Sequence, residues 1–214
     1  MDASLRRALA VALGPGSVLQ DGSVLAPGSA EGVQAVLRIA QEWRLPLHIA
    51  SGAGDASDAP EGGAVLSLGR LTAIAVDAAN GIARAEAGAT VAALIRSLAA
   101  ARVAVAGLGG HAAQSRVGSL VGAGGLPRRS LCGLEAALPG GDLVRAGAAV
   151  LKDVVGYDVT SLLLGSAGRL AAVVAVQLRL TPAGARAETV PAAGVRPTGE
   201  VAAVFDPLGI LAGG

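Results

Sequence analysis

The chain has 214 residues, a formal net charge of +1 and 52% apolar residues. With one Trp, one Tyr and one Phe and no basic block, it lacks the stacking surfaces and positive charge that nucleic-acid binding needs. Its one cysteine, Cys132, excludes an internal disulfide and a thiol-rich metal or iron–sulfur site on this chain alone, and two histidines are too few for a zinc site. Apolar runs fall short of the roughly 20 residues of a spanning helix, and the N-terminus does not fit a secretory signal, so we expect a cytoplasmic location.

Strands and helices alternate in the first part of the chain. Ser29 is a suitable N-cap for a helix, because apolar residues recur at helical spacing after it, and Thr90 is a suitable cap for a second helix. Asn80-Gly81 is a hairpin signal. The predicted elements are a helical stretch that ends at 15–16, a strand at 18–26, a helix from 29 to about 43, a buried strand at 45–50, a small-residue loop at 51–63, strands at 64–68, 71–76 and 82–86, and a helix at 90–101.

A second region rich in glycine, residues 107–125, is predicted as a loop that separates a first lobe from a second. After it we expect strands at 134–138 and 143–146, a short helix at 159–164, a small-residue loop at 165–168 and a strand at 171–180. Residues 183–198 have no periodicity and are predicted to be a linker. The sequence therefore predicts an α+β fold whose domain, residues 1–182, has lobes at about 1–106 and 107–182, followed by the linker and a closing segment at 199–214.

Four stretches carry a family resemblance, and they occur in the family's order along nearly the whole chain. Small residues in the loops let a ligand approach the backbone. The stretches are 26–33 with 45–54, then 117–125, then 152–158 with 165–168, and finally 204–211. Together they resemble the FAD-linked oxidase family with a vanillyl-alcohol-oxidase-type (PCMH-type) FAD-binding domain, most closely the smaller FAD-binding subunit of glycolate oxidase. The resemblance implies a two-lobed PCMH-type FAD-binding domain.

The same resemblance implies which residues contact the cofactor. Family members usually have an Arg and consecutive glycines in the first loop, where this chain has Ser51-Gly52-Ala53-Gly54-Asp55, but successive N–H groups in such a turn can still bind an anion. The predicted contacts are Gly52, Ala53, Gly54, Asp55, Gly118, Ser119, Gly124, Gly125, Tyr157, Asp158, Gly165 and Ser166.

Noncovalent attachment of FAD is predicted. Asp55 stands where a covalently attached His would be expected, and Cys132 follows the second loop in an apolar setting typical of a buried thiol. No catalytic or metal-binding residue is assigned. His111 has no partner carboxylate nearby in the sequence and is interpreted as a polar surface group, and His48 as a structural residue in an apolar strand.

The last matching stretch, 204–211, resembles a closing motif that follows a substrate-binding cap domain in full-length members. Because only a short connection precedes it here, we expect the cap to be missing and the substrate site to come from elsewhere. The implied function is an FAD-binding subunit of a glycolate or D-lactate oxidising complex. Its implied partners are a larger FAD-linked oxidase subunit and an iron–sulfur subunit, through which it could associate peripherally with a membrane. The alternatives are a scaffold subunit that has lost FAD and, more weakly, an independent small oxidase.

Overall fold

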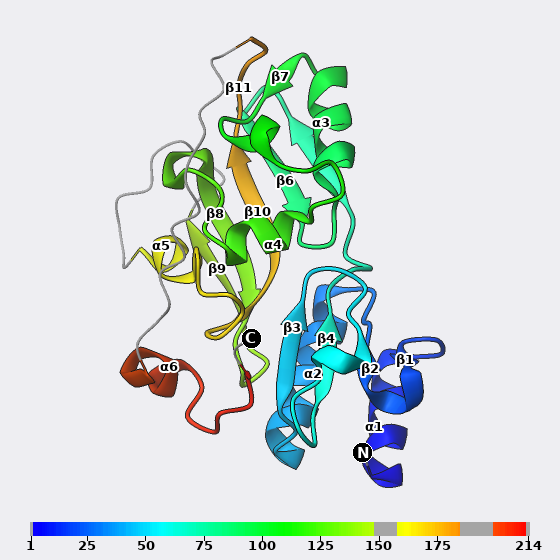
Figure 1. Cartoon of the computed structure of the whole chain (residues 1–214). Coiled ribbons are helices and arrows are strands. Elements are labelled where there is room, and N and C mark those ends of the chain that lie inside the picture. The colour runs from blue at the N-terminus through cyan, green and yellow to red at the C-terminus, as the bar shows by residue number, and fades with distance from the viewer. Residues whose placement is uncertain (1, 148–157, 185–198, 213–214) are drawn as a thin grey trace.

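The structure, a computed structural model, describes residues 2–147, 158–184 and 199–212. Within these ranges the strands form a four-stranded sheet in the order β1-β2-β4-β3, a five-stranded sheet in the order β5-β6-β10-β8-β9, and a small pair of β11 and β7 (Figure 1). Helices and sheets are mixed throughout, which confirms the predicted α+β fold class. No helix in these ranges is long and apolar enough to cross a membrane.

The four-stranded sheet uses the N-terminal part of the chain. The prediction of one continuous strand at 18–26 is wrong. Gln20 and Asp21 have φ values of 48° and 55°, and they turn the chain back on itself in the middle of this stretch. Two short antiparallel strands result, and the second runs parallel to β4. The elements are α1 (Ala3–Leu13), β1 (Val18–Leu19), β2 (Val24–Leu25), α2 (Ala30–Trp43), β3 (Leu47–Ala50) and β4 (Ala64–Ser67).

Helix α2 confirms the prediction from its cap and periodicity. The Ser29 side chain accepts a hydrogen bond from the Gly32 N–H at 3.2 Å, which satisfies one of the free donors of the first turn. The helix ends at Arg44, whose φ of 52° is left-handed. Its apolar side is fully buried against α1 and the sheet. Each buried Val or Leu on this side stabilises the folded state by about 1.5–3 kcal/mol, because its side chain is removed from water. These buried residues are Val33, Val36, Leu37 and Ala40.

The five-stranded sheet is antiparallel and draws on both predicted lobes. Strand β10 pairs with β6 on one side and with β8 on the other. The sheets therefore divide the chain between β4 and β5, which differs from the boundary expected near residue 106, because β6 supplies the partner for one edge of β10. The elements are β5 (Ile74–Asp77), β6 (Ile82–Glu86), α3 (Val91–Ala100), β7 (Val103–Ala104), α4 (Val117–Gly122), β8 (Leu131–Ala137), β9 (Leu143–Gly147), α5 (Val159–Leu163), β10 (Ala172–Arg179) and β11 (Thr181–Pro182).

Helix α4 lies inside the region predicted as a loop, so that prediction is wrong for residues 117–122. Gly118 and Gly122 are poor helix formers, so the sequence of this segment does not indicate a helix. Tertiary packing decides the matter, because Val117 and Val121 are buried in the core beside the five-stranded sheet. In Figure 1, α3 and α4 lie on one side of that sheet.

The other side of the five-stranded sheet carries an ion pair that spans β10. Arg84 on β6 donates from Nε to Glu135 Oε1 at 2.8 Å and from Nη2 to Glu135 Oε2 at 3.0 Å, so that the contact between β6 and β8 is bidentate. This hydrogen bonding lowers the pKa of Glu135 against the opposing effect of its burial.

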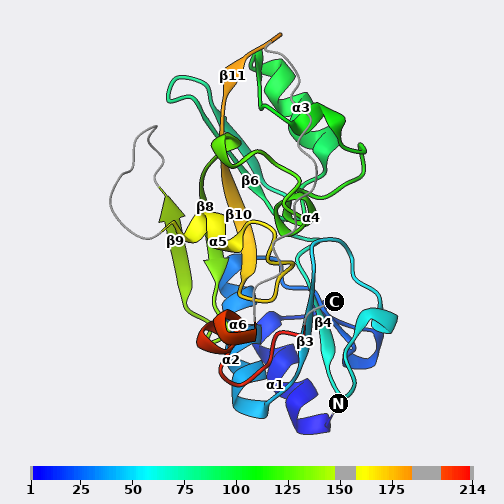
Figure 2. The same cartoon turned by 60° about the vertical axis from the view of Figure 1, so that its left-hand side comes forward.

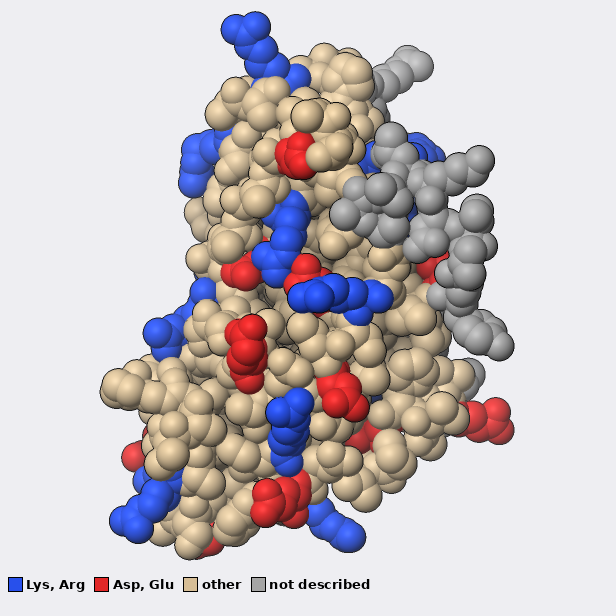
Figure 3. Space-filling view, turned by 180° about the vertical axis from the view of Figure 1, so that it is seen from behind, with Lys and Arg blue, Asp and Glu red and all other residues tan. Residues whose placement is uncertain are grey.

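Seen from behind, positive and negative side chains are interspersed on the surface (Figure 3).

The C-terminal segment returns to the four-stranded sheet. After α6 (Gly199–Phe205), drawn red in Figure 2, the chain runs parallel to β3 and forms a bridge between Leu211 and Leu47. The Leu47 N–H donates to the Ile210 carbonyl at 2.6 Å, and the Ala212 N–H donates to the Leu47 carbonyl at 2.8 Å. Residues 210–212 therefore cover the outer edge of β3.

Candidate functional site

A cleft of about 400 Å³ lies where the two large sheets meet. Its walls come from the end of β3 and the loop after it, from α4, from the end of α5 with the loop at 165–168, and from the start of β10. The lining residues are His48, Ile49, Ala50, Ser51, Gly52, Leu68, Gly118, Ser119, Gly122, Ala123, Leu163, Ser166, Ala167, Gly168, Ala171 and Val173. The three small-residue stretches singled out in the sequence, two of which are loops and one of which forms α4, thus all contribute to one cleft.

The first wall is the loop after β3, which β4 holds in place. Ser67 Oγ donates to the Gly52 carbonyl at 2.7 Å and accepts from the Gly69 N–H at 3.3 Å. A Cβ on Gly69 would lie 2.6 Å from the Gly52 carbonyl oxygen, so only glycine permits this approach. The backbone N–H groups of residues 51–55 donate no hydrogen bond to any atom of the residues that the structure describes. A run of unpaired N–H groups beside a cleft is suited to an anion.

The second wall is α4, which lies against the first. A Cβ on Gly118 would be 2.6 Å from Ser51 Oγ and 2.8 Å from Ala87 Cβ, so the absence of a side chain allows α4 to approach. The Gly118 N–H donates to the Ala87 carbonyl at 2.8 Å. Ser119, the next residue, is exposed at the cleft.

The third wall is the loop after α5. The Gly165 N–H donates to the Val121 carbonyl at 2.8 Å and the Ala167 N–H to the Gly122 carbonyl at 3.1 Å, which attaches the loop to the end of α4. Ser166 is only 1% exposed, and its hydroxyl has no hydrogen-bond partner among the described residues. Because it lines the cleft, this hydroxyl is available to a ligand.

The predicted contact residues divide into two groups. Four of them line the cleft: Gly52, Gly118, Ser119 and Ser166. Tyr157 lies outside the described residues. The remainder are not among the lining residues, namely Ala53, Gly54, Asp55, Gly124, Gly125, Asp158 and Gly165.

Two of the residues beyond the lining have structural contacts of their own. Gly54 has a φ of 72°, and a Cβ there would lie 2.7 Å from Val65 Cγ1, so the turn itself requires glycine. The Gly125 carbonyl is 2.8 Å from Nε2 of His111, the loop histidine to which no catalytic role was assigned.

Both predicted aspartates form hydrogen bonds within the protein. Asp55 accepts from the Ser57 N–H at 2.9 Å and from Ser57 Oγ at 2.8 Å, and the backbone hydrogen bond is the main cause of its lowered pKa. Asp158 caps α5 through the Ser161 N–H and pairs with Arg128. The hydrogen bond from Arg128 is the largest cause that lowers the pKa of Asp158 to about 2. These carboxylates therefore shape the loops rather than the cleft surface.

Several lining residues were missed by the sequence reasoning. His48 was interpreted as structural, yet it lies in the cleft wall because β3 presents it there. Ala167 has a φ of 52°, which is a left-handed conformation. An alanine in the sequence does not predict such a conformation. Gly168 has a φ of 76° and packs against Ile49, where a Cβ would be 3.1 Å from the Ile49 Cβ. Gly122 was the most accessible to prediction, since it belongs to the glycine-bearing second stretch.

Comparison with known proteins identifies this architecture. A family profile described as an FAD binding domain matches residues 22–147. Since that match covers more than half of the chain, the chain belongs to this family of FAD-binding domains, and the predicted membership is confirmed.

Curated relatives agree with the family. The chain is 34% identical over 169 residues to an uncharacterised FAD-linked oxidoreductase of Mycobacterium tuberculosis, covering 73% of this chain and 37% of that protein. It is 32% identical over 170 residues to D-lactate dehydrogenase of Archaeoglobus fulgidus, with 74% and 38% covered. It is 29% identical over 174 residues to glycolate oxidase subunit GlcD of Bacillus subtilis, with 75% and 37% covered. The chain thus spans less than two-fifths of the length of these relatives.

Solved structures confirm the fold. 4-Ethylphenol oxidase from Gulosibacter chungangensis superposes with a TM-score of 0.66 at 21% identity, over 84% of this chain and 42% of that one. p-Cresol methylhydroxylase superposes with a TM-score of 0.67 at 20% identity, over 84% and 43%. The mixed architecture is therefore that of a PCMH-type FAD-binding domain.

The residues present fit the FAD that this family binds. The unpaired N–H groups of Ser51 and Gly52, which line the cleft, suit the diphosphate, and the Ser166 hydroxyl supplies a buried polar contact. Glycines at 52, 118 and 122 allow the cofactor to lie against backbone. No Lys or Arg is among the lining residues of this cleft, so the backbone is the source of positive potential there.

Proposed function

We propose that this chain is the FAD-binding part of an oxidoreductase that acts on a 2-hydroxy acid such as glycolate or D-lactate. The convergence of two small-residue loops and the glycine-bearing helix α4 on one cleft, with unpaired N–H groups and a buried hydroxyl, carries the proposal. Bound FAD would accept a hydride from the hydroxyl-bearing carbon of the acid. The chain's own residues bind and orient the cofactor.

We further propose that the substrate site lies outside the described residues. A 2-hydroxy acid carries a carboxylate, which is usually bound by a cationic side chain, and none lines this cleft. A larger FAD-linked oxidase subunit is proposed to supply this recognition, and an iron–sulfur subunit to receive the electrons, in the cytoplasm or at a membrane surface. Copurification of the tagged chain from its host, with FAD and iron measured on the complex, tests these partners.

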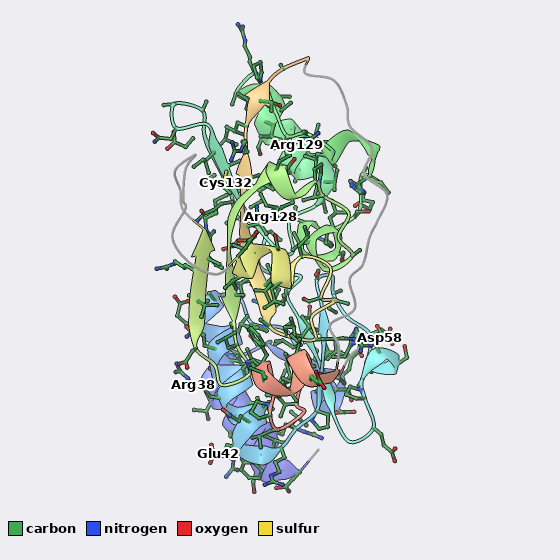
Figure 4. All side chains as sticks on the ribbon, turned by 90° about the vertical axis from the view of Figure 1, so that its left-hand side faces the viewer. Arg38, Glu42, Asp58, Arg128, Arg129 and Cys132 are labelled. Atoms are coloured by element: carbon green, nitrogen blue, oxygen red, sulfur yellow. The ribbon has the colours of Figure 1, made fainter. Side chains whose placement is uncertain are left out.

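Noncovalent binding of FAD is part of the proposal. Cys132 lies on β8 and is not among the lining residues, and Asp55 is engaged with Ser57 (Figure 4 labels Cys132). After acid precipitation, all flavin should stay in the supernatant. Flavin fluorescence in the washed protein pellet would contradict this assignment.

The direct experiment is the visible absorption spectrum of the purified chain, with the flavin released by heat and identified by chromatography. Stoichiometric FAD supports the proposal. A colourless protein that does not bind added FAD would leave the scaffold alternative, in which the same fold only organises its neighbours.

A matched pair of substitutions tests whether this cleft is the FAD site. Gly52 lines the cleft, Gly109 does not, neither has a positive φ, and a Cβ added to either meets no atom within 4 Å. Gly52→Val should therefore fold normally but lose most of its FAD, because the branched side chain would occupy the cleft. Gly109→Val should fold and keep FAD. Equal flavin content in the two variants would place the cofactor elsewhere.

A further inference from the structure

Asp206 is a buried carboxylate that the cleft does not use. It is 7% exposed, and it accepts hydrogen bonds from the Ile210 N–H at 3.0 Å and from the Leu211 N–H at 2.6 Å. Both acceptor oxygens are thus engaged, each by a different backbone donor. Charge-assisted hydrogen bonds of this kind are stronger than neutral ones, so Asp206 fixes the turn at 206–211.

That turn delivers the next residues to the outer edge of β3. Ile210 and Leu211 are 2% and 8% exposed and belong to the core of the first sheet. On either side of Leu211, the Ile210 carbonyl and the Ala212 N–H bond to the backbone of Leu47. Leu47 is therefore held on one edge by the C-terminal segment and on the other by β4.

The same strand forms the first wall of the cleft. The three residues after Leu47, at 48–50, line it, and the unpaired N–H groups at 51–55 follow directly. Arg169, immediately after the third loop, also borders a smaller cavity of about 250 Å³ together with Asp206 and Leu211. The C-terminal segment therefore lies behind one wall of the cleft and next to the loop that forms another.

We propose that Asp206 is a positioning residue for FAD, and that docking of residues 206–212 onto β3 is energetically coupled to FAD binding in the cleft. This inference rests on the proposed FAD site. When the segment is docked, β3 is paired on both edges and presents residues 48–55 in one geometry. When it is not, β3 becomes an edge strand that is free to shift. Coupling between two sites is reciprocal, so FAD must stabilise the docked segment as much as the segment favours FAD.

Hydrogen exchange on the unmodified chain tests this reciprocity without any substitution. When the segment is docked, the Ile210 and Leu211 N–H groups donate to Asp206 and the Ala212 N–H donates to the Leu47 carbonyl on β3. Saturating FAD should slow their exchange severalfold. The N–H groups of α1, whose residues do not line the cleft, serve as the internal reference. Exchange at 210–212 that is unchanged by saturating FAD overturns the proposal.

A matched pair of variants tests the residue itself. Asp206→Asn removes the charge and places an amide donor against a backbone donor. Asp142→Asn instead changes an exposed carboxylate in the β8–β9 turn, whose side chain forms no hydrogen bond or ion pair within the described ranges. We expect Asp206→Asn to raise the Kd for FAD about tenfold or more and to abolish the FAD-dependent protection at 210–212. Asp142→Asn should leave both unchanged.

The possible outcomes separate the two proposals. If the unmodified chain binds no FAD, the proposed function fails and this inference fails with it. If the unmodified chain binds FAD and Asp206→Asn binds it equally well with the same protection, only the coupling is wrong. A variant that unfolds leaves the exchange experiment on the unmodified chain to decide.

Discussion

Arg128 and Asp158 join the segment before β8 to the start of α5, with Arg128 Nη2 2.8 Å from Asp158 Oδ1. Arg128 also donates from Nε to Ser161 Oγ at 2.8 Å and from Nη1 to the Leu131 carbonyl at 2.8 Å. Figure 4 shows Arg128 beside α5. Because α5 leads directly to Leu163 and Ser166 in the cleft, this surface pair influences the third wall although neither side chain lines it.

The pair predicts a modest dependence of stability on pH. The folded-state pKa of Asp158 is about 2, below its usual 3.8, so the stabilisation is present above pH 3.8 and is lost as the pH falls towards 2. Side chains 43% and 52% exposed are screened by solvent, so the contribution is under about 1 kcal/mol. Urea unfolding of Asp158→Asn should show lower stability than the unmodified chain at pH 7 and a smaller difference near pH 3. A difference that grows on acidification would contradict this assignment.

The Arg84–Glu135 pair predicts a larger effect, because Glu135 is more buried. Glu135→Ala should lower the free energy of unfolding by about 2 kcal/mol, since Arg84 then loses a bidentate partner. Replacing both residues by apolar ones, Arg84→Met with Glu135→Leu, should recover most of that loss. Chemical denaturation of the three proteins measures it, and a double variant no more stable than Glu135→Ala would disprove the pairing argument.

Replacing each of the two glycines of α4 by alanine should change the stability of the protein in opposite directions. Gly118→Ala places a methyl group 2.6 Å from Ser51 Oγ and should cost about 1–3 kcal/mol of stability while weakening FAD binding. At Gly122 the nearest atom to an added Cβ is 3.7 Å away, so Gly122→Ala should gain up to about 1 kcal/mol from helix propensity. Thermal unfolding distinguishes them. Equal melting temperatures would show that α4 does not pack as described.

The contact between α2 and the β8–β9 turn should also depend on one glycine. Gly141 has a φ of 82°, and its carbonyl accepts from Gln34 Nε2 at 2.8 Å and from Arg38 Nη2 at 3.3 Å. A Cβ there would overlap Arg38 Cγ. Gly141→Ala should therefore destabilise the packing between the two sheets by about 1–3 kcal/mol, whereas Gly140→Ala, whose nearest atom is 3.6 Å away, should be tolerated. Denaturation midpoints of the two variants provide the measurement, and similar midpoints would argue against this contact.

Local signals in the sequence predicted the elements that are formed by local interactions. The Ser29 cap and the apolar spacing after it gave α2 nearly to the residue, and Asn80-Gly81 gave the β5–β6 turn. The failures have tertiary causes. Gly118 and Gly122 conceal α4 because close packing, not propensity, requires them, and no local pattern reveals that β10 inserts between β6 and β8.

The candidate site was predictable where it is built from small-residue loops. Gly52, Gly118 and Ser166 were identified in that way and line the cleft. His48 on β3 and Leu68 directly after β4 were not, because their position depends on how β3 and β4 pair and where each strand ends. Asp158 stays a predicted contact, and its pairing with Arg128, thirty positions earlier in the chain, is revealed only by the fold.

The central position of β10 has a consequence for how the chain is made. As the polypeptide leaves the ribosome, β6 and β8 emerge long before the strand that joins them, so each has an edge without its final neighbour until residue 179 has been synthesised. Pairings so distant in sequence form slowly and leave aggregation-prone intermediates exposed. The cleft wall at Ala171 and Val173 lies at the start of this late strand, so the proposed FAD site is complete only after β10 has been translated.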